Sequence, residues 1–261
     1  MRKYLIIILG IIVIFCFAYA SLAAQEIKQD ALLNDALVLL KFRKDKDARV
    51  IFEKILLKEP NNLDALWGKA EVLRRSRDYS QSEVMFQEIL NKNPGHIPSL
   101  ISMAYIECKD SHLNEAVKLV DRVLNAECLD KDNQALAYVM LGNINSRWAI
   151  KGGFFSKIKY GTKIKSYFFK AKEISPDLPE IHLALGTFYL LAPKLIGGNL
   201  EKAIKELEYT VKIAPDFATA NARLAQYHKI KGDSKKYAFY FNRAKELDPK
   251  NEVLQELNKN Q

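Results

Sequence analysis

The sequence carries four marks that recur every 34 residues: a small residue, another small residue twelve positions later, a bulky apolar residue four beyond it, and a proline eight further on. The first three sets are Ala36, Ala48, Phe52 and Pro60; Ala70, Ser82, Phe86 and Pro94; and Ala104, Ala116 and Val120, with Cys128 at the proline position. Near the C-terminus, Ala225, Tyr237, Phe241 and Pro249 keep the same spacing. A repeat of this length is typical of a solenoid, in which each unit packs only on its neighbours.

Each mark has a physical role in a pair of antiparallel helices. A small residue midway along a helix lets a second helix axis approach closely, and the bulky residue fills the space between neighbouring pairs. Proline ends the second helix because it lacks the amide hydrogen that an interior helical position donates. The pattern therefore predicts an all-α chain built from repeated helix pairs.

The stretches "LWGKAEVLRRSRDYSQSEVMFQEILNKNPG" and "ANARLAQYHKIKGDSKKYAFYFNRAKELDPKN" resemble the tetratricopeptide repeat (TPR) family. The resemblance extends from about Gln29 to Asn251 and implies a right-handed superhelical solenoid of about six helix pairs. We expect this solenoid to occupy residues 25–251 and residues 252–261 to cap its end. The fold says little about function, because such solenoids bind many unrelated partners.

The first 24 residues differ from the rest. Arg2 and Lys3 precede 17 uncharged, largely apolar residues, 4–20, and small residues then offer cleavage after Ala20 or Ala23. This pattern predicts a signal peptide and places the rest of the chain in the periplasm or elsewhere in the bacterial cell envelope. The alternative is an uncleaved anchor in the inner membrane, because 17 apolar residues reach the lower limit for spanning hydrocarbon.

Two units depart from the repeat. The distance between the two small positions is twelve residues in units one, two, three and six, but it is 22 from Gly142 to Ile164 and 17 from Gly186 to Ala203. The fourth and fifth units therefore carry insertions between their helices, on the same edge of the solenoid. In the second insertion Pro193 ends a helix, Gly197 and Gly198 allow a turn, and Asn199 can cap the next helix.

The chain shows no pattern of a catalytic or metal site. His96, His112, His182 and His228 fall in different units, without the spacing of paired metal ligands or a phosphate-binding glycine loop. We therefore expect no enzyme activity, no metal and no cofactor. Cys108 and Cys128 belong near opposite ends of a helix pair, roughly 15 Å apart along the helix axis, so we expect two free, at least partly buried thiols.

The first helices of a stacked solenoid line its concave side, so residues three before, one after and four after each first small residue should form a groove. The groove is expected to be apolar and aromatic at its N-terminal end and more polar towards the C-terminus. We predict that a partner segment binds there, or that a neighbouring part of the chain or a second copy covers the apolar end. The groove residues are Leu33, Leu37, Trp67, Glu71, Arg74, Ile101, Tyr105 and Asn143.

A second candidate surface is electrostatic. Residues 133–172 contain no Asp or Glu, yet they hold eight basic residues against a formal net charge of +9 for the chain. Aromatic side chains alternate with these lysines in "WAIKGGFFSKIKYG", a mixture that suits an anionic membrane surface or polymer; the alternative is that the rings pack an enlarged turn. The residues of this basic edge are Arg147, Trp148, Lys151, Phe154, Lys157, Lys159, Lys163 and Lys165.

The block from Lys157 to Ala203 is also similar to exported bacterial repeat proteins, among them the T component of TRAP-type transporters. That resemblance implies a periplasmic partner of a solute-binding protein. Taken together, the sequence favours a non-enzymatic scaffold of the cell envelope that binds a protein or peptide partner. The alternatives are docking on anionic lipid or polymer through residues 147–172, or a membrane-anchored regulator inside the cell. Export disfavours nucleic acid, and the oligomeric state is left open.

Overall fold

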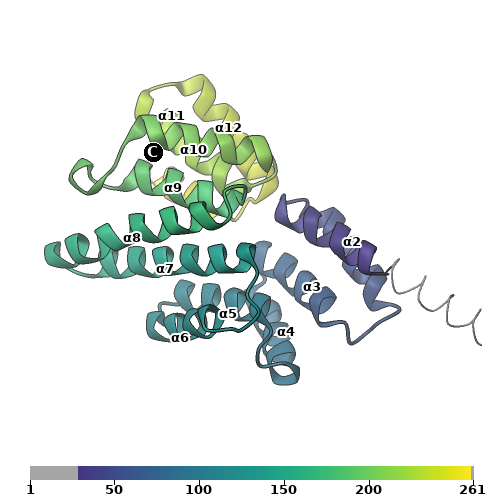
Figure 1. Cartoon of the computed structure of the whole chain (residues 1–261). Coiled ribbons are helices and arrows are strands. Elements are labelled where there is room, and N and C mark those ends of the chain that lie inside the picture. The colour runs from purple at the N-terminus through teal and green to yellow at the C-terminus, as the bar shows by residue number, and fades with distance from the viewer. Residues whose placement is uncertain (1–28, 260–261) are drawn as a thin grey trace, which may run out of the picture.

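The computed structural model describes residues 29–259, so the predicted signal peptide lies outside the described residues. The described chain is helical and contains no strand. A first helix covers residues 29–41 of this part. The elements that follow are α2 (Asp45–Leu56), α3 (Leu63–Arg75), α4 (Tyr79–Lys92), α5 (Ile97–Lys109), α6 (Leu113–Leu124), α7 (Lys131–Lys151), α8 (Phe154–Ile174), α9 (Pro179–Leu191), the 3₁₀ turn η1 (Lys194–Ile196), α10 (Leu200–Ile213), α11 (Ala218–Lys231), α12 (Ser234–Leu247) and α13 (Glu252–Lys259) (Figure 1).

Six helix pairs follow one another along the chain, each packed against its neighbours, and α13 packs on α11 and α12 at the end. The repeat marks lie where the pattern predicted. Ala36, Ala48, Ala70, Ser82 and Ala104 are fully buried, and the bulky residues of the first two units, Phe52 and Phe86, are fully buried as well. The solenoid of helix pairs is thus confirmed.

The small residues of the repeat leave room for a large side chain of the facing helix. A Cβ added to Gly142 would lie 2.2 Å from the Phe168 ring, and one added to Gly186 would lie 2.7 Å from Leu207. In each case a residue on the first helix of a unit makes room for the bulky residue on the second. Close approach of two helix axes at these points is what the sequence pattern encodes.

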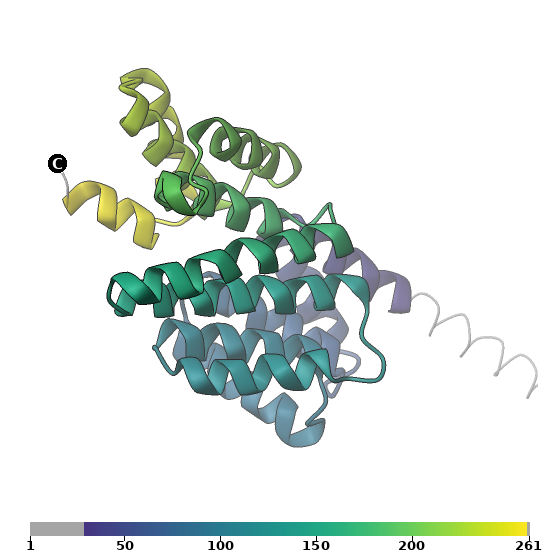
Figure 2. The same cartoon turned by 60° about the vertical axis from the view of Figure 1, so that its left-hand side comes forward.

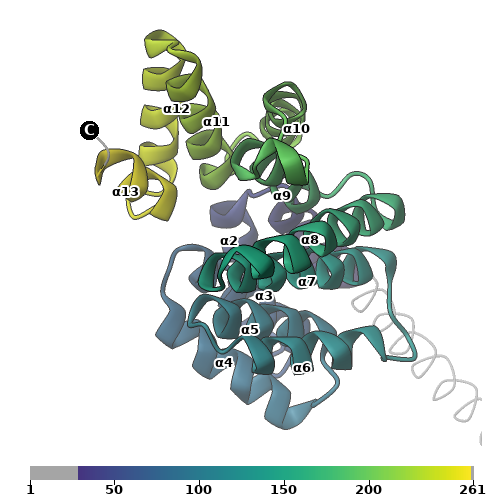
Figure 3. The ribbon, with the colours of Figure 1, turned by 90° about the vertical axis from the view of Figure 1, so that its left-hand side faces the viewer.

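The first helices form the inner face of the solenoid. Successive first helices pack on each other, α3 on α5, α5 on α7, α7 on α9 and α9 on α11, whereas no such packing joins successive second helices of the described chain. The view in Figure 3 shows α3 and α5 inside α4 and α6. Side chains on the first helices therefore face the concave side.

The insertion in the fourth unit is helical. α7 and α8 each have 21 residues, against 12 to 14 in most other helices, and only Gly152 and Gly153 separate them. The two long helices form a hairpin that projects from one edge (Figures 1 and 2). The extra residues thus lengthen two helices and do not form an enlarged turn.

The insertion in the fifth unit is compact. Pro193 precedes η1, Gly197 has a positive φ of 110°, and the side chain of Asn199 accepts a hydrogen bond from the amide of Lys202. The amide of Asn199 in turn donates to the carbonyl of Tyr189. Each of these residues has the local role that its type predicted.

Both cysteines of the described chain are free thiols, as expected. Cys108 is buried, and burial raises its pKa. Cys128 is exposed, so the expectation that it would be partly buried is wrong. Its position after α6, in an irregular stretch where the other units have proline, explains the difference.

Candidate partner-binding surfaces

The predicted groove residues of the first three units form an apolar strip. Leu33 and Leu37 lie on the first helix, and both are half-buried against a core cluster that also contacts Trp67 on α3. Trp67 reaches the next cluster too, where Ile101 and Tyr105 of α5 are half-buried. These five side chains come from three successive first helices and keep part of their surface in contact with solvent.

The polar groove residues Glu71 and Arg74 bond to each other and to other side chains of the protein. The carboxylate of Glu71 accepts hydrogen bonds from Arg74 Nε at 2.7 Å, Arg75 Nε at 2.8 Å and Ser102 Oγ at 3.0 Å. Ser102 accepts in turn from the indole of Trp67 at 3.1 Å. Glu71 is 4% exposed, so this carboxylate belongs to the protein interior and not to an open groove.

Electrostatics explain how a charged group is held there. Burial alone would raise the pKa of Glu71, but the adjacent Arg74 and Arg75 outweigh burial and lower it well below its ordinary range. The guanidinium of Arg74 also lies 4.1 Å from the centroid of the Tyr105 ring, a cation–π distance. The network fixes the orientation of Trp67 and Tyr105, the two aromatic residues of the strip.

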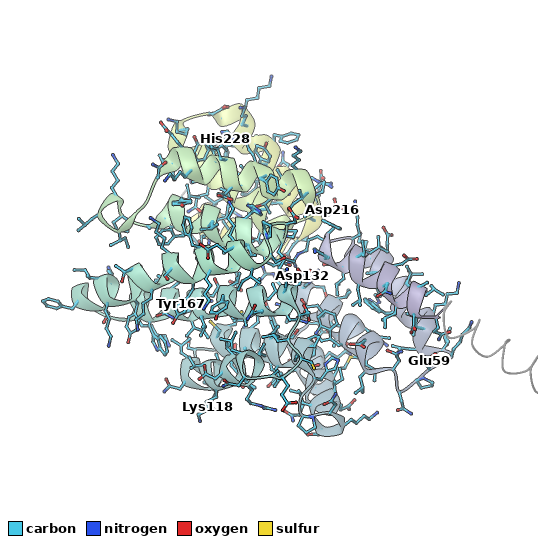
Figure 4. The ribbon with its side chains drawn as sticks, viewed as in Figure 1. Glu59, Lys118, Asp132, Tyr167, Asp216 and His228 are labelled. Carbon is cyan, nitrogen blue, oxygen red and sulfur yellow. The ribbon has the colours of Figure 1, made fainter. Side chains whose placement is uncertain are left out.

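A row of ion pairs closes the solenoid on itself. Cations at the end of the first helix, in the segment after it and in the turn after α3 bind carboxylates at the starts of the later units. The pairs are Lys41–Asp132 at 2.8 Å, Arg43–Glu180 at 2.6 Å, Lys44–Asp216 at 2.7 Å, and Arg77 with Asp248 at 2.9 Å and with Glu252 at 3.0 Å. We call these the closing pairs. Figure 4 labels Asp132 and Asp216, which lie on the side of the later units that faces α2.

The best buried of the closing pairs is Arg43 with Glu180, whose side chains are only 12% and 18% exposed. Burial, and then the neighbouring Arg75, lower the pKa of Arg43, although Glu180 opposes this effect. The guanidinium of Arg43 also lies 3.8 Å from the centroid of the Phe217 ring. The inner face is therefore bridged by side chains where the first two units meet the fifth and sixth.

Asn143, the remaining groove residue, is half-buried on α7 and contributes no apolar surface to the strip. The structure brings together the groove residues of units one to three, whereas the groove does not continue as an apolar strip into unit four. Arg43 and Glu180 of the closing pairs and Arg75 of the Glu71 network were not among the predicted site residues. A signal was available for Arg75, because Glu71 stands three and four residues before two arginines, a spacing that pairs charges on a helix.

The basic edge lies along the α7–α8 hairpin. Lys151, Lys157, Lys159, Lys163 and Lys165 are exposed, and Arg147 is exposed near the end of α7. Trp148 and Tyr160 are half-buried and contact each other, with ring centroids 5.3 Å apart. Two aromatic side chains of this edge thus pack α7 against α8. Phe154 begins α8.

The described residues contain no group of three or more His, Cys, Asp or Glu side chains placed to hold a metal ion. The four histidines make ordinary contacts. His182, for example, is hydrogen-bonded to Glu206 and to the carbonyl of Pro176. Within residues 29–259 no helix combines the length and the hydropathy that crossing a bilayer requires.

Solved structures with a similar arrangement of helices come from distant proteins. A tetratricopeptide repeat protein from Parabacteroides merdae is 15% identical, with a TM-score of 0.51, and the match covers 88% of this chain and 83% of that one. The chain has the tetratricopeptide-repeat fold. Human IFIT1, solved as a dimer with m7Gppp-AAAA, is 19% identical with a TM-score of 0.58; the match covers 87% of this chain and 52% of IFIT1. No protein-family model and no curated protein sequence matches the chain.

Proposed function

We propose that this TPR protein is a non-enzymatic scaffold of the bacterial cell envelope and that it holds a segment of a partner protein against the apolar strip of units one to three. The observation that carries the proposal is the half-buried state of Leu33, Leu37, Trp67, Ile101 and Tyr105. A contiguous set of apolar side chains, packed on the core on one side and exposed to solvent on the other, gains stability when a partner segment buries the remaining surface. The envelope location rests on the pattern of residues 1–24.

The chemistry of the strip favours an apolar partner segment. Glu71 and Asp45 pair with Arg74 and Arg75, so these four groups together offer no net charge to a ligand. Aromatic anchors with few rotatable bonds, such as Trp67 and Tyr105, lose little conformational entropy on binding and carry much of the energy of protein interfaces. Binding should therefore depend weakly on salt.

Photocrosslinking in the cell that produces the protein tests this proposal. A photoreactive amino acid replaces Ile101 in the full chain, or Val84 on α4 as the control, since Val84 is apolar, 60% exposed and on a second helix. The Ile101 probe should yield a defined adduct with one protein that the Val84 probe does not yield.

Substitutions in the strip then decide whether the adduct depends on it. Trp67→Ala or Tyr105→Glu should reduce the adduct at least about tenfold, the usual effect of losing an aromatic anchor. Circular dichroism must show that the variants remain folded. An adduct that persists in both variants would place the partner elsewhere and refute the proposed groove.

A further inference from the structure

Exposed apolar side chains gather at the end of the α7–α8 hairpin and on the neighbouring 3₁₀ turn. Ile150 is 76% exposed, Phe155 85% and Ile158 41%, all close to the turn between α7 and α8. On the next unit Leu195, within η1, is 85% exposed, and Leu191 is 50% exposed just before it. Sequence reasoning had identified only the basic and aromatic residues of the hairpin, and these aliphatic residues change what the surface can bind.

The two parts form one surface because η1 packs on α8. A Cβ added to Gly161 of α8 would lie 3.1 Å from Ile196, and one added to Gly197 would lie 3.8 Å from Lys165. We call this surface the tip patch. Its members, apolar and basic, are Ile150, Lys151, Phe155, Lys157, Ile158, Lys159, Lys163, Lys165, Leu191, Lys194 and Leu195.

The tip patch also projects. A helix of 21 residues is about 10 Å longer than one of 13 or 14, so the end of the hairpin stands clear of α5, α6 and α9. In Figures 1 and 2 this end lies on the opposite side of the molecule from the start of the described chain. A flat partner can reach it without meeting the other units.

We propose that the tip patch docks on the surface of an anionic lipid bilayer. The apolar side chains would enter the boundary between headgroups and acyl chains, while the surrounding lysines bind lipid phosphates. Residues 133–172 contain no carboxylate that could repel those phosphates. Trp148 and Tyr160 are half-buried just behind the tip. In a docked protein they would lie at the level of the lipid headgroups, where Trp and Tyr side chains are enriched.

The composition disfavours the other macromolecular partners. Lysine is depleted at the centre of protein–protein interfaces, yet six of the eleven residues of the tip patch are lysines. Single-stranded nucleic acid is bound by stacking successive bases on several aromatic faces, whereas Phe155 is the one exposed ring among the members of the tip patch. The rings of Trp148 and Tyr160 already contact each other. An anionic bilayer uses both the charge and the aliphatic surface.

Fluorescence quenching in vesicles tests the proposal with the full chain. Phe155→Trp introduces an indole at the tip, and Val84→Trp introduces one at an exposed apolar position of α4 as the control. Each variant is reconstituted into phosphatidylcholine vesicles with or without phosphatidylglycerol, with bromine on the acyl chains as the quencher. The emission of the unsubstituted chain, from Trp67 and Trp148, is subtracted. All variants share residues 1–28, so these residues cannot cause a difference between them.

The indole of Phe155→Trp should be quenched several-fold more than that of Val84→Trp, and only when phosphatidylglycerol is present. Adding Lys157→Glu with Lys159→Glu should abolish the difference. Adding Lys54→Glu with Lys58→Glu, the same charge change on exposed lysines near the end of α2, should leave it intact. Equal quenching of the Phe155→Trp and Val84→Trp indoles would overturn the proposal and leave a protein or nucleic acid as the partner of the patch. Quenching of the Phe155→Trp indole that is the same with and without phosphatidylglycerol would overturn it as well.

Discussion

At the scale of single residues, Glu71 shows how the repeat positions of an inner face can serve the protein itself. Its position on α3 is one that the repeat geometry assigns to the groove, and the sequence therefore predicted a partner-binding role. The structure instead surrounds the carboxylate with Arg74, Arg75 and Ser102. Spacing could predict that these groups share a face, but not that they would be buried, because burial depends on how closely α5 approaches.

Glu71→Ala should destabilise the fold by about 3 to 5 kcal/mol, because it leaves the buried guanidinium of Arg74 without its carboxylate and that of Arg75 with Asp45 alone. The matched control is Glu53→Ala on α2. Glu53 also pairs with an arginine on its own helix, Arg49 at 2.8 Å, but these side chains are 43% and 50% exposed. Its loss should cost less than about 1 kcal/mol. Urea denaturation followed by circular dichroism measures the free energy of unfolding of both variants. An equal decrease in the two would show that burial of the Glu71 network adds nothing to the stability of the fold.

At the scale of elements, the spacing predicts extra residues between the helices of the fourth and fifth units but not the form that they take. The regular marks indicate the helix pairs of units one, two, three and six, since a small residue opposite a bulky one is a local signal. The stretch between Gly142 and Ile164 holds no proline, and its only adjacent pair of glycines is Gly152-Gly153, while Gly161 stands alone. Extending α7 and α8 satisfies their backbone hydrogen bonds, so lengthened helices are favoured over a long loop.

Two glycines of the insertions should respond in opposite ways to alanine. A Cβ at Gly198 would lie 1.8 Å from the carbonyl oxygen of Ala192, so Gly198→Ala must displace backbone and should cost about 2 kcal/mol or more. A Cβ at Gly153 would meet nothing within 4 Å, and its φ is −71°. Gly153→Ala should therefore be neutral or stabilise by up to about 1 kcal/mol through the unfolded state. Thermal unfolding of the two variants checks this, and a loss at Gly153 would contradict the described hairpin turn.

At the scale of the whole molecule, the closing pairs join residues up to 175 positions apart. No local pattern indicates them, because they depend on how tightly successive units curve. The carboxylates stand at or just before the starts of α7, α9, α11 and α13, where helix dipoles favour negative charge, and the cations stand at the ends of the first helix and α3, where positive charge is favoured. The carboxylates and the cations are therefore each favoured by the dipole of their own helix, independently of the ion pair that they form.

Among the described residues, α2, α3 and α4 make no extensive packing with the helices of the last two units; long side chains make the connection. Arg43→Ala with Arg77→Ala should therefore open the solenoid while leaving each helix pair folded. Small-angle X-ray scattering should report a larger radius of gyration at an unchanged circular dichroism signal. Arg49→Ala with Arg122→Ala, which removes two exposed arginines that contact no residue of the closing pairs, is the control. An unchanged radius in the first variant would mean that the curvature is set by packing between successive units alone.

Acid should open the closing pairs in the same way. The hydrogen bond from Lys44 lowers the pKa of Asp216; for Asp132, burial alone would raise the pKa, but hydrogen bonds from Lys41 and Ser175 outweigh burial and lower it. Both carboxyl groups are thus more acidic in the folded than in the unfolded chain. The stability they contribute is complete above their ordinary value of 3.8 and is lost as the pH falls through the lower, folded values.

The radius of gyration should consequently rise below about pH 4, where these carboxylates begin to take up protons, before the helical signal is lost. Asp132→Asn with Asp216→Asn should show part of the same expansion at neutral pH, because an amide cannot replace the charge of either carboxylate. Arg74 and Arg75 lower the pKa of Glu71 much further, so its carboxylate stays charged and its ion pairs within the first units persist while the closing pairs open. Scattering and circular dichroism recorded on the same acid titration separate the two events, and expansion that coincides with the loss of helix would show that the closing pairs do not open on their own.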